Sequence, residues 1–148
     1  MTGALVLITN AAATLFMVGL IWLIQIVHYP LMGTLSAEAM PSYARAHQRR
    51  ITFIVGPAML IEAISSIALI FVHPVGVSWP ALVAGLLLVV FIFYRTATLH
   101  VPQHQRLAHC YDPKVCQDLI RTNWWRTVAW TSRGAIVLFL LGETTALQ

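Results

Sequence analysis

The sequence predicts an all-α integral membrane protein, built as a four-helix bundle whose helices extend into the cytosol. Of its 148 residues, 59% are hydrophobic and 9% are charged, whereas an ordinary soluble domain has about 25% charged residues. Four apolar runs are each long enough to cross a hydrocarbon core about 30 Å thick. The basic residues gather in two of the connections between these runs, which gives the bundle a direction.

The four apolar runs and their short connections use nearly the whole chain. Residues 1–148 should therefore form a single transmembrane domain, with no separate soluble domain. Turn-forming residues mark the ends of the runs, since Tyr29-Pro30 follows the first run, and Pro74 and Gly76 lie in the second connection. The predicted spans are residues 4–27, 51–72, 79–99 and 124–141.

Arginine and lysine collect after the first span and after the third, while both tails and the second connection contain neither. Because cytoplasmic loops carry the excess of positive charge, the two long connections should be cytoplasmic and both termini outside. Pro41 and Pro113 stand near expected helix starts, so the second and fourth helices should begin in the cytosol. The basic residues form no continuous stripe, which argues against nucleic acid as a partner. The basic residues of the two long connections are Arg45, Arg49, Arg50, Arg106, Lys114 and Arg121.

Glu62 lies deep in the second span, where an ionised carboxylate is costly unless it is paired, coordinated or protonated. At a helical rise of about 1.5 Å per residue, Glu62 lies about 16 Å and Arg133 about 14 Å from the cytoplasmic edge. Arg133 is therefore the better-matched partner, while Arg95 lies at about 7 Å and could still reach Glu62. Two interpretations stay open: a structural ion pair that fixes the helix register, or a catalytic group in which Glu62 handles a proton with Arg133 or Arg95.

Four histidines are expected at one depth, near the cytoplasmic face. His28 ends the first span, His47 precedes the second, and His100 and His104 end the third at the i, i+4 spacing of one helical face. Imidazole suits iron, copper and zinc, so these four residues are candidate metal ligands, and haem is a further candidate. The alternative is that they are interfacial histidines that bind phosphates or water. Pro102 counts against the metal site, because proline can kink or end the helix that aligns His100 with His104.

An unbroken helix would separate His47 from Glu62 by about 22 Å, so these two residues could not share one metal there.

The polar residues of the first span lie on one helical face, which should turn toward the bundle interior. That face consists of Asn10, Thr14, Met17, Ile21, Gln25 and His28. At the inner interface, the fourth span adds hydrogen-bond donors and aromatic faces. Candidate cofactor-binding residues are Gln25, Asn123, Trp124 and Arg126.

An ordered set of motifs resembles a widespread family of small four-span bacterial membrane proteins. The motifs are Trp22-x-x-Gln25-x-x-His28-Tyr29-Pro30, His47-x-x-Arg50, Pro57, Glu62, Val101-Pro102-x-His104, Thr122-Asn123-Trp124-x-Arg126-Thr127, Trp130 and Arg133. The resemblance covers most of the chain and implies a fold and a bacterial inner membrane, but no activity. The chain is also similar in size and hydropathy to the anthrone oxygenase-like membrane family, which implies oxidation of a hydrophobic aromatic substrate.

These observations favour a membrane-embedded, metal-dependent oxidoreductase for a hydrophobic or lipid-dissolved substrate. In this hypothesis, the four histidines bind iron, copper or zinc, and Glu62 acts with Arg133 or Arg95. The alternative is a small accessory subunit of a larger membrane complex that binds haem, a chlorin pigment or a quinone. A transporter is a third hypothesis, which alternating access would make dependent on a homo-oligomer.

Overall fold

All secondary structure in the computed structural model, which describes residues 2–145, is helical. Two of its segments are short π-helical turns, labelled η, which join α-helices into longer rods. The first rod comprises α1 (Thr2–Leu23), η1 (Ile24–His28) and α2 (Tyr29–Met32). The second rod is α3 (Met40–Val72). The third comprises α4 (Trp79–Arg95), η2 (Thr96–His100) and α5 (Val101–His109), and the fourth rod is α6 (Pro113–Thr145).

Three of the four rods are long and apolar enough to cross a membrane, by length and composition. They are Thr2–Met32, Met40–Val72 and Trp79–His109, which contain the first three predicted spans. These helices indicate an integral membrane protein. The fourth predicted span lies inside α6, which is as long as α3 at 33 residues but more polar. The crossing of α6 therefore stays a prediction.

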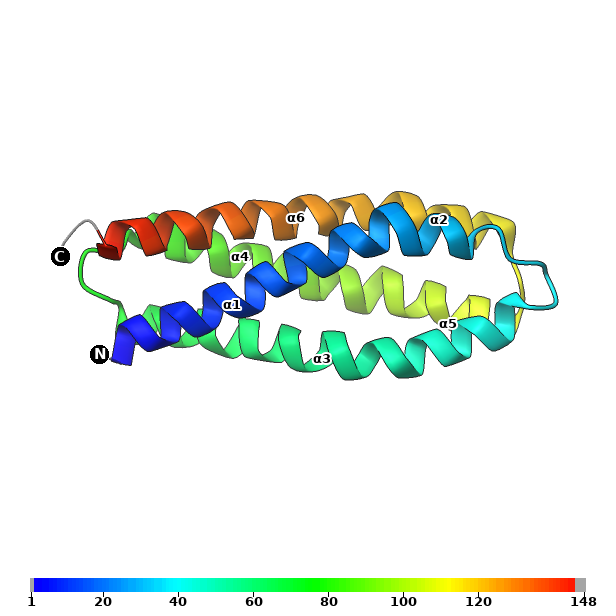
Figure 1. The fold of residues 1–148 in the computed structure, drawn as a ribbon, viewed down its shortest axis with the longest axis horizontal. Helices are drawn as coiled ribbons and strands as arrows, with labels where there is room; N and C mark the ends of the chain where they lie inside the picture. Colours follow the sequence, from blue (N-terminus) through cyan, green and yellow to red (C-terminus); the bar gives the residue numbers. More distant parts are fainter. Residues whose placement is uncertain (1, 146–148) are drawn as a thin grey trace.

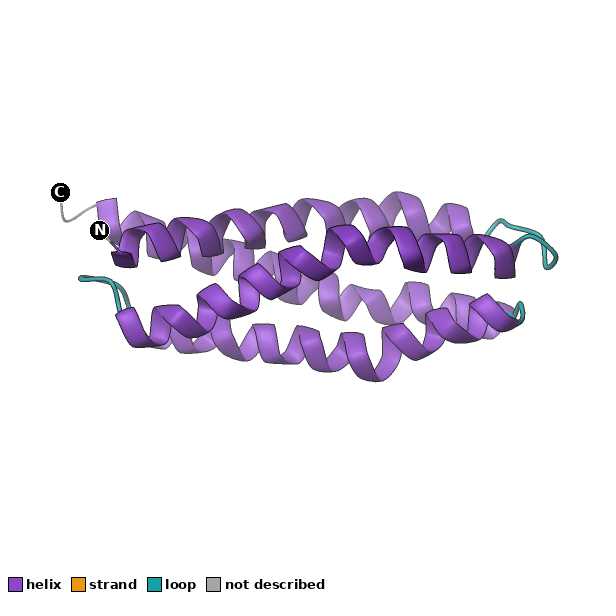
Figure 2. Cartoon of the chain, turned by 90° about the horizontal axis from the view of Figure 1, so that it is seen from below, coloured by secondary structure: helices purple, strands orange, loops and turns teal. Residues whose placement is uncertain are grey.

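The four rods run alternately up and down along the molecule (Figures 1 and 2). The first rod packs against α3 and α6, and α4 packs against the same two helices from the opposite side. The connections 33–39 and 110–112 lie at one end, which we call the loop end. The first and last described residues, 2 and 145, and the connection 73–78 lie at the other end. The basic segments between the predicted spans therefore share the loop end, as predicted. Their arginines and Lys114 lie on the helix ends, since 33–39 and 110–112 contain no basic residue.

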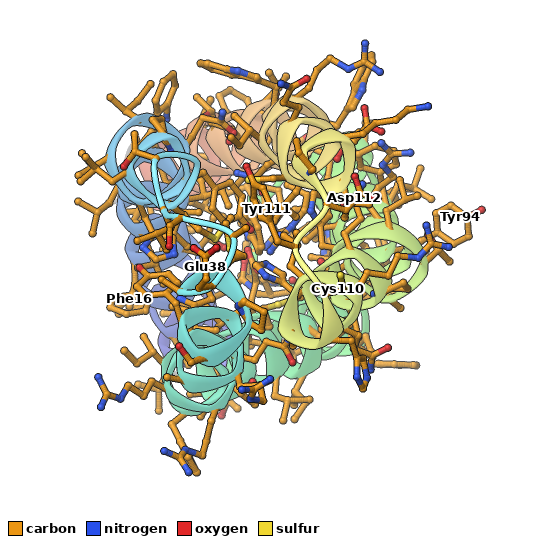
Figure 3. The ribbon with its side chains drawn as sticks, turned by 90° about the vertical axis from the view of Figure 1, so that its right-hand side faces the viewer. Phe16, Glu38, Tyr94, Cys110, Tyr111 and Asp112 are labelled. Atoms are coloured by element: carbon orange, nitrogen blue, oxygen red, sulfur yellow. The ribbon has the colours of Figure 1, made fainter. Side chains whose placement is uncertain are left out.

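Three of the rods begin before their predicted spans and three continue past them, whereas the third rod begins at residue 79 and α3 ends at residue 72, as predicted. α3 starts 11 residues before residue 51, and α6 starts at Pro113, so the predicted extensions at the loop end are helical. The third rod continues through Pro102 to His109, so that proline does not end the helix. Viewed from the loop end, the side chains of Phe16 and Tyr94 point away from the centre of the four rods (Figure 3).

Each π-helical turn ends on a histidine that is followed by x-Pro. η1 ends at His28 before Tyr29-Pro30, and η2 ends at His100 before Val101-Pro102. A proline clashes with the carbonyl four residues earlier, and for Pro30 and Pro102 that carbonyl lies inside the π-helical turn. The wider turn accommodates the ring without ending the rod. The i, i+4 spacing of His100 and His104 therefore crosses a change of helix geometry.

The predicted polar face of the first rod is turned inward along most of its length. Asn10, Thr14, Met17, Ile21 and Gln25 are buried, and His28 at the end of the face is half-buried. In the middle of the molecule, an apolar cluster separates two groups of buried polar residues. This cluster contains Met17, Ile21, Met59, Ile92, Ala129 and Trp130. The two polar groups are the candidates for a functional site.

Candidate functional site

The first polar group is the ion pair between Glu62 and Arg133, which is the pairing predicted from their depths. Arg133 Nε donates a hydrogen bond of 2.8 Å to Glu62 Oε1. The Glu62 side chain is 1% exposed and the Arg133 side chain 2%. Thr14 Oγ1 donates to the same carboxylate oxygen at 2.8 Å, and Trp130 Nε1 donates to Oε2 at 3.0 Å. Each carboxylate oxygen therefore has at least one donor inside the protein.

All three nitrogens of the Arg133 guanidinium donate hydrogen bonds. Its Nη1 donates to the carbonyl of Gly85 at 2.5 Å, and its Nη2 lies 3.2 Å from Asn10 Oδ1 and 3.1 Å from Ser66 Oγ. The three nitrogens thus bond to residues on the other three rods. A charge pair that is buried and fully hydrogen-bonded in this way fixes the relative position of helices. The geometry supports the structural interpretation of Glu62 and Arg133.

Arg95, the other predicted partner of Glu62, does not join this network. The ion pairs among residues 2–145 are Arg133–Glu62 and an exposed Arg121–Asp118 pair. The Nε of Arg95 has no hydrogen-bond partner, and its residue is half-buried. α3 is a continuous helix across Gly56-Pro57. Glu62 therefore stays apart from the histidines, as the spacing from His47 predicted.

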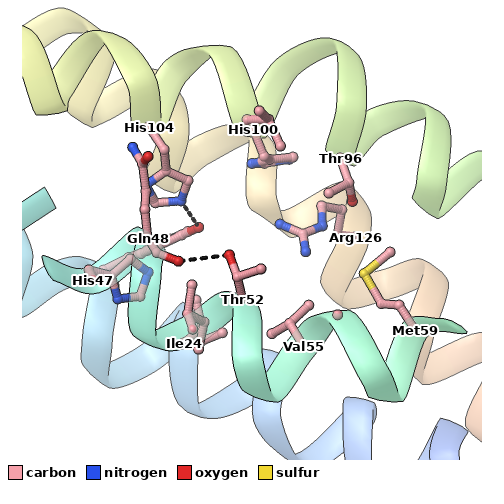
Figure 4. A pocket seen from close by; sticks show the side chains of 14 residues that line it. Ile24, His47, Gln48, Thr52, Val55, Met59, Thr96, His100, His104 and Arg126 are labelled. Atoms are coloured by element: carbon pink, nitrogen blue, oxygen red, sulfur yellow. Dashed lines mark hydrogen bonds between the residues drawn. The ribbon is translucent and has the colours of Figure 1, made fainter. Parts of the chain in front are cut away.

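The second polar group lines a cavity of about 280 Å³ in the loop-end half of the molecule (Figure 4). Its apolar wall includes Ile24, Ile51, Val55 and Met59. The polar side chains come from three rods: Tyr29 from the first, His47 and Gln48 from α3, and His100 and His104 from the third. Arg126 from α6 completes the lining. We call this cavity the histidine pocket.

Three of the predicted histidines, each from a different rod, are brought close together. The rings of His28 and His47 stack with centroids 4.3 Å apart and planes at 22°, and the centroid of His104 lies 5.4 Å from that of His47. Tyr29 is hydrogen-bonded through its hydroxyl to His104 Nε2 at 3.0 Å. His100 lines the same pocket one turn deeper along the third rod. Tyr29 was missed by the sequence reasoning, although it directly follows a predicted site residue.

Several buried nitrogens around the pocket have no protein partner. Both ring nitrogens of His100, Nδ1 of His104, Nε2 of His28 and Nε of Arg126 are buried and without a hydrogen bond. Buried polar groups without partners are rare in folded proteins, and each needs an explanation such as a ligand or an ordered water. Their concentration around one cavity makes the histidine pocket the candidate functional site.

Arg126 is held in the pocket by a relay of amides. Its Nη1 donates to Asn123 Oδ1 at 3.2 Å, and Asn123 Nδ2 donates to Gln25 Oε1 at 2.9 Å. Gln25 Nε2 in turn donates to the carbonyl of Ile120 at 3.2 Å. Three of the four predicted cofactor-binding residues thus form one chain of hydrogen bonds. Only Arg126 of these three lines the pocket, so the two amides position it.

Trp124, the fourth predicted cofactor-binding residue, lies on the outer surface. Its side chain is 42% exposed, and its ring packs edge-on against Trp22 at a centroid distance of 5.7 Å. Trp22 Nε1 donates to Thr131 Oγ1 at 3.0 Å. Trp124 therefore belongs to an aromatic contact between the first rod and α6, at a distance from the pocket lining.

The predicted four-histidine metal site is not present as a preformed coordination shell. Among residues 2–145, no group of three or more His, Cys, Asp or Glu side chains is arranged to hold a metal ion. The stacking of His28 on His47 offers one reason, because stacked rings present their faces to each other and not their nitrogens to a common point. Metal binding by these residues stays a prediction.

Comparison of the chain with models of protein families, with curated proteins and with solved structures finds no match. The fold and the site therefore carry the functional argument.

Proposed function

We propose that this chain crosses a bacterial inner membrane four times, with both termini outside. α6 supports this because it is as long as α3 and turns Asn123, Thr127 and Arg133 inward, where α1 and α4 cover them. Its Val128, Leu138 and Phe139 side chains are more than half exposed, as lipid-facing residues would be. The helix ends that carry the basic residues lie together at the loop end, which favours a cytoplasmic position for that end.

Cys110, exposed at the loop end, gives a direct test of this orientation. In Cys116→Ser protein, a membrane-impermeant maleimide should label Cys110 in inside-out vesicles and leave it unlabelled in intact spheroplasts. Labelling from the outside of spheroplasts would reverse the topology. Labelling of both preparations after permeabilisation confirms that the thiol is reactive.

We further propose that the histidine pocket binds a hydrophobic, lipid-dissolved small molecule. The observation that carries this proposal is the cavity of about 280 Å³, whose wall area is mostly apolar and whose polar side chains include several with unpaired nitrogens. Small-molecule sites have this composition, and their volumes begin at about 300 Å³. The two π-helical turns reach the same region, and such turns frequently occur at functional sites.

The pocket proposal is tested by filling the cavity. Val55 lines the pocket, and the Val55→Trp variant should lose any small molecule that is recovered by solvent extraction of the purified protein and detected by mass spectrometry. Val128→Trp is the matched control, because Val128 is 57% exposed on the outer surface. Equal recovery of the same molecule from both variants would contradict the proposal.

An oxidoreductase that uses a transition metal is the enzymatic form of this proposal. Its support is the proximity of His28, His47 and His104, because neutral imidazoles bind iron, copper and zinc. Binding would require the stacked rings to turn so that their nitrogens converge. Elemental analysis of the purified protein should then find about one metal per chain, lost on His47→Phe. Less than roughly 0.2 metal per chain would contradict the metal hypothesis, since a genuine site retains its ion through its ligands.

The accessory-subunit hypothesis places a quinone, haem or chlorin in the same pocket. The observation that favours a quinone is the presence of Arg126, His100 and His104 as donors around one apolar cavity, since they could bind carbonyl oxygens. An absorption spectrum of the extracted ligand separates these classes. A stable stoichiometric partner protein in native purification would favour the subunit hypothesis over a solitary enzyme.

A further inference from the structure

We infer that the ligand of the histidine pocket carries a carboxylate, which Arg126 binds, on an apolar chain. This inference rests on the proposed function, because it requires that the pocket is a ligand site. It specifies the chemical class of the ligand and the residue that selects it.

The charge of Arg126 is the starting point. Arg126 is 6% exposed, yet neither ion pair within residues 2–145 includes it. Its contacts include the amide oxygen of Asn123, the hydroxyl of Tyr29 and the ring of Trp130, whose centroid lies 5.0 Å from the guanidinium carbon. None of these three side chains is a carboxylate. A buried cation without an anionic partner is costly, so an anion that enters the pocket gains a strong interaction.

Arg126 lines the cavity and has one unpaired nitrogen, and other donors lie around it. Its Nε has no partner, and the guanidinium lies between His100 and Met59 in the pocket (Figure 4). His100 has two unpaired ring nitrogens at 1% exposure, and a neutral imidazole has one N–H to donate. An arginine and an imidazole N–H together provide the donors that a carboxylate uses.

The size and charge of the site favour a carboxylate over a phosphate. The pocket lining contains one arginine and no lysine, which matches a single negative charge. A phosphate monoester carries a charge of about −1.5 to −2 near neutral pH. A volume of about 280 Å³ leaves room for a head group and part of an apolar chain, but not for a complete lipid.

The remainder of the chain can leave the pocket toward the lipid. Thr52 of α3 and Val101 of α5 both line the pocket and both are exposed on the outer surface, so the opening lies between these two helices. Ile51 and Val55 continue the apolar wall from the interior to this opening. A fatty-acid-like molecule would therefore place its carboxylate at Arg126 and its tail in the membrane.

Oleate labelled with ¹³C at its carboxyl carbon is the probe, added to the full-length protein in a neutral detergent. Nuclear magnetic resonance should show a separate, saturable signal for bound carboxylate. Methyl oleate and hexadecyl phosphate should displace it at least tenfold less effectively than unlabelled oleate. This comparison uses only the unmodified chain, so it does not depend on the folding of a variant.

Variants then assign the signal to Arg126. Arg126→Gln should weaken oleate binding by about tenfold to a hundredfold, as expected for the loss of a charged hydrogen bond. Arg126→Lys should retain part of the affinity, and Arg106→Gln, which removes an exposed arginine from α5, should bind as the parent protein does. Thermal unfolding of each variant shows whether its fold is intact.

Two results would overturn the inference. The first is that methyl oleate competes as well as oleate, and the second is that a folded Arg126→Gln protein binds oleate with unchanged affinity. In either case, the pocket binds apolar molecules without recognising a carboxylate. The proposed function would then stand and the carboxylate would be wrong. If none of the three probes binds saturably and the Val55→Trp comparison also recovers no pocket-dependent molecule, both the inference and the proposed function fail.

Discussion

Trp130 connects the two buried polar groups, because its ring lies 5.0 Å from the guanidinium carbon of Arg126 and its Nε1 donates to Glu62 at 3.0 Å. The indole is fully buried. Through this one side chain, the ion pair that fixes the helices also supports the cation that lines the histidine pocket. The Glu62–Arg133 network therefore contributes to the site by positioning, although it does not line the cavity.

The Trp130→Phe variant tests this connection. Phenylalanine retains an aromatic face for Arg126 but removes the hydrogen bond to Glu62, so the free energy of unfolding should fall by about 2 kcal/mol. Thermal or denaturant unfolding in detergent measures the loss. Trp22→Phe is the control, because Trp22 is 40% exposed and its hydrogen bond to Thr131 lies at the surface. Equal losses for the two variants would contradict a special role for Trp130.

Glu62→Gln should destabilise the protein by about 3 to 5 kcal/mol, because it leaves Arg133 as an unpaired buried charge. The double variant Glu62→Gln with Arg133→Gln removes both charges and should be more stable than Glu62→Gln alone. Unfolding of the parent, both single variants and the double variant completes a double-mutant cycle. Additive effects would show that the 2.8 Å contact does not couple the two residues.

Gly85 is expected to tolerate no side chain. A Cβ at this position would lie 3.1 Å from Arg133 Nη1 and 3.6 Å from the side chain of Ile136. Gly85→Val would thus push the guanidinium away from Glu62, and we expect a loss of stability of about 1 to 3 kcal/mol from overpacking. Gly19→Val provides the control, since nothing lies within 4 Å of a Cβ there. The melting temperature of Gly85→Val should therefore be lower than that of Gly19→Val, and equal melting temperatures would contradict the prediction.

Depth counting and helical periodicity predicted part of this arrangement from the sequence. They located the first three apolar helices, the inward face of the first rod and the pairing of Glu62 with Arg133, because rise and turn per residue are nearly constant in a helix. The same counting placed His28, His47, His100 and His104 at a common depth, and the structure brings the rings of His28, His47 and His104 together, with His100 one turn deeper. The counting could not show how their rings turn, because ring orientation depends on packing between rods.

The π-helical turns explain other differences between sequence and structure. Sequence reasoning treated Pro102 as a residue that kinks or ends a helix, whereas η2 accommodates it and the rod continues. The repeated His-x-Pro pattern at His28 and His100 was a usable signal for both turns. Trp124 gave no comparable signal, because its polar neighbours in sequence point inward while its own ring faces outward.

The two cysteines should differ in reactivity, and this difference tests the packing of the loop end. Cys110 is exposed, whereas Cys116 is 3% exposed in an apolar cluster with Met40 and Leu119. Burial raises the pKa of the Cys116 thiol. Because the thiolate is the reactive form, maleimide should modify Cys110 rapidly and Cys116 slowly in the folded protein, with equal labelling after denaturation.

Because the pKa of Cys116 is raised in the folded protein, the free energy of unfolding should depend on pH. Above the ordinary pKa of a cysteine, the thiol of the unfolded chain loses its proton while folded Cys116 keeps it, so the folded state binds more protons. The contribution of Cys116 to stability is therefore fully present below that range and decreases as pH rises through it. Unfolding measured from pH 7 to pH 10 should show a smaller decrease for Cys116→Ala than for the parent protein, while Cys110→Ala should follow the parent. A parent-like decrease in Cys116→Ala would assign the pH dependence to other groups.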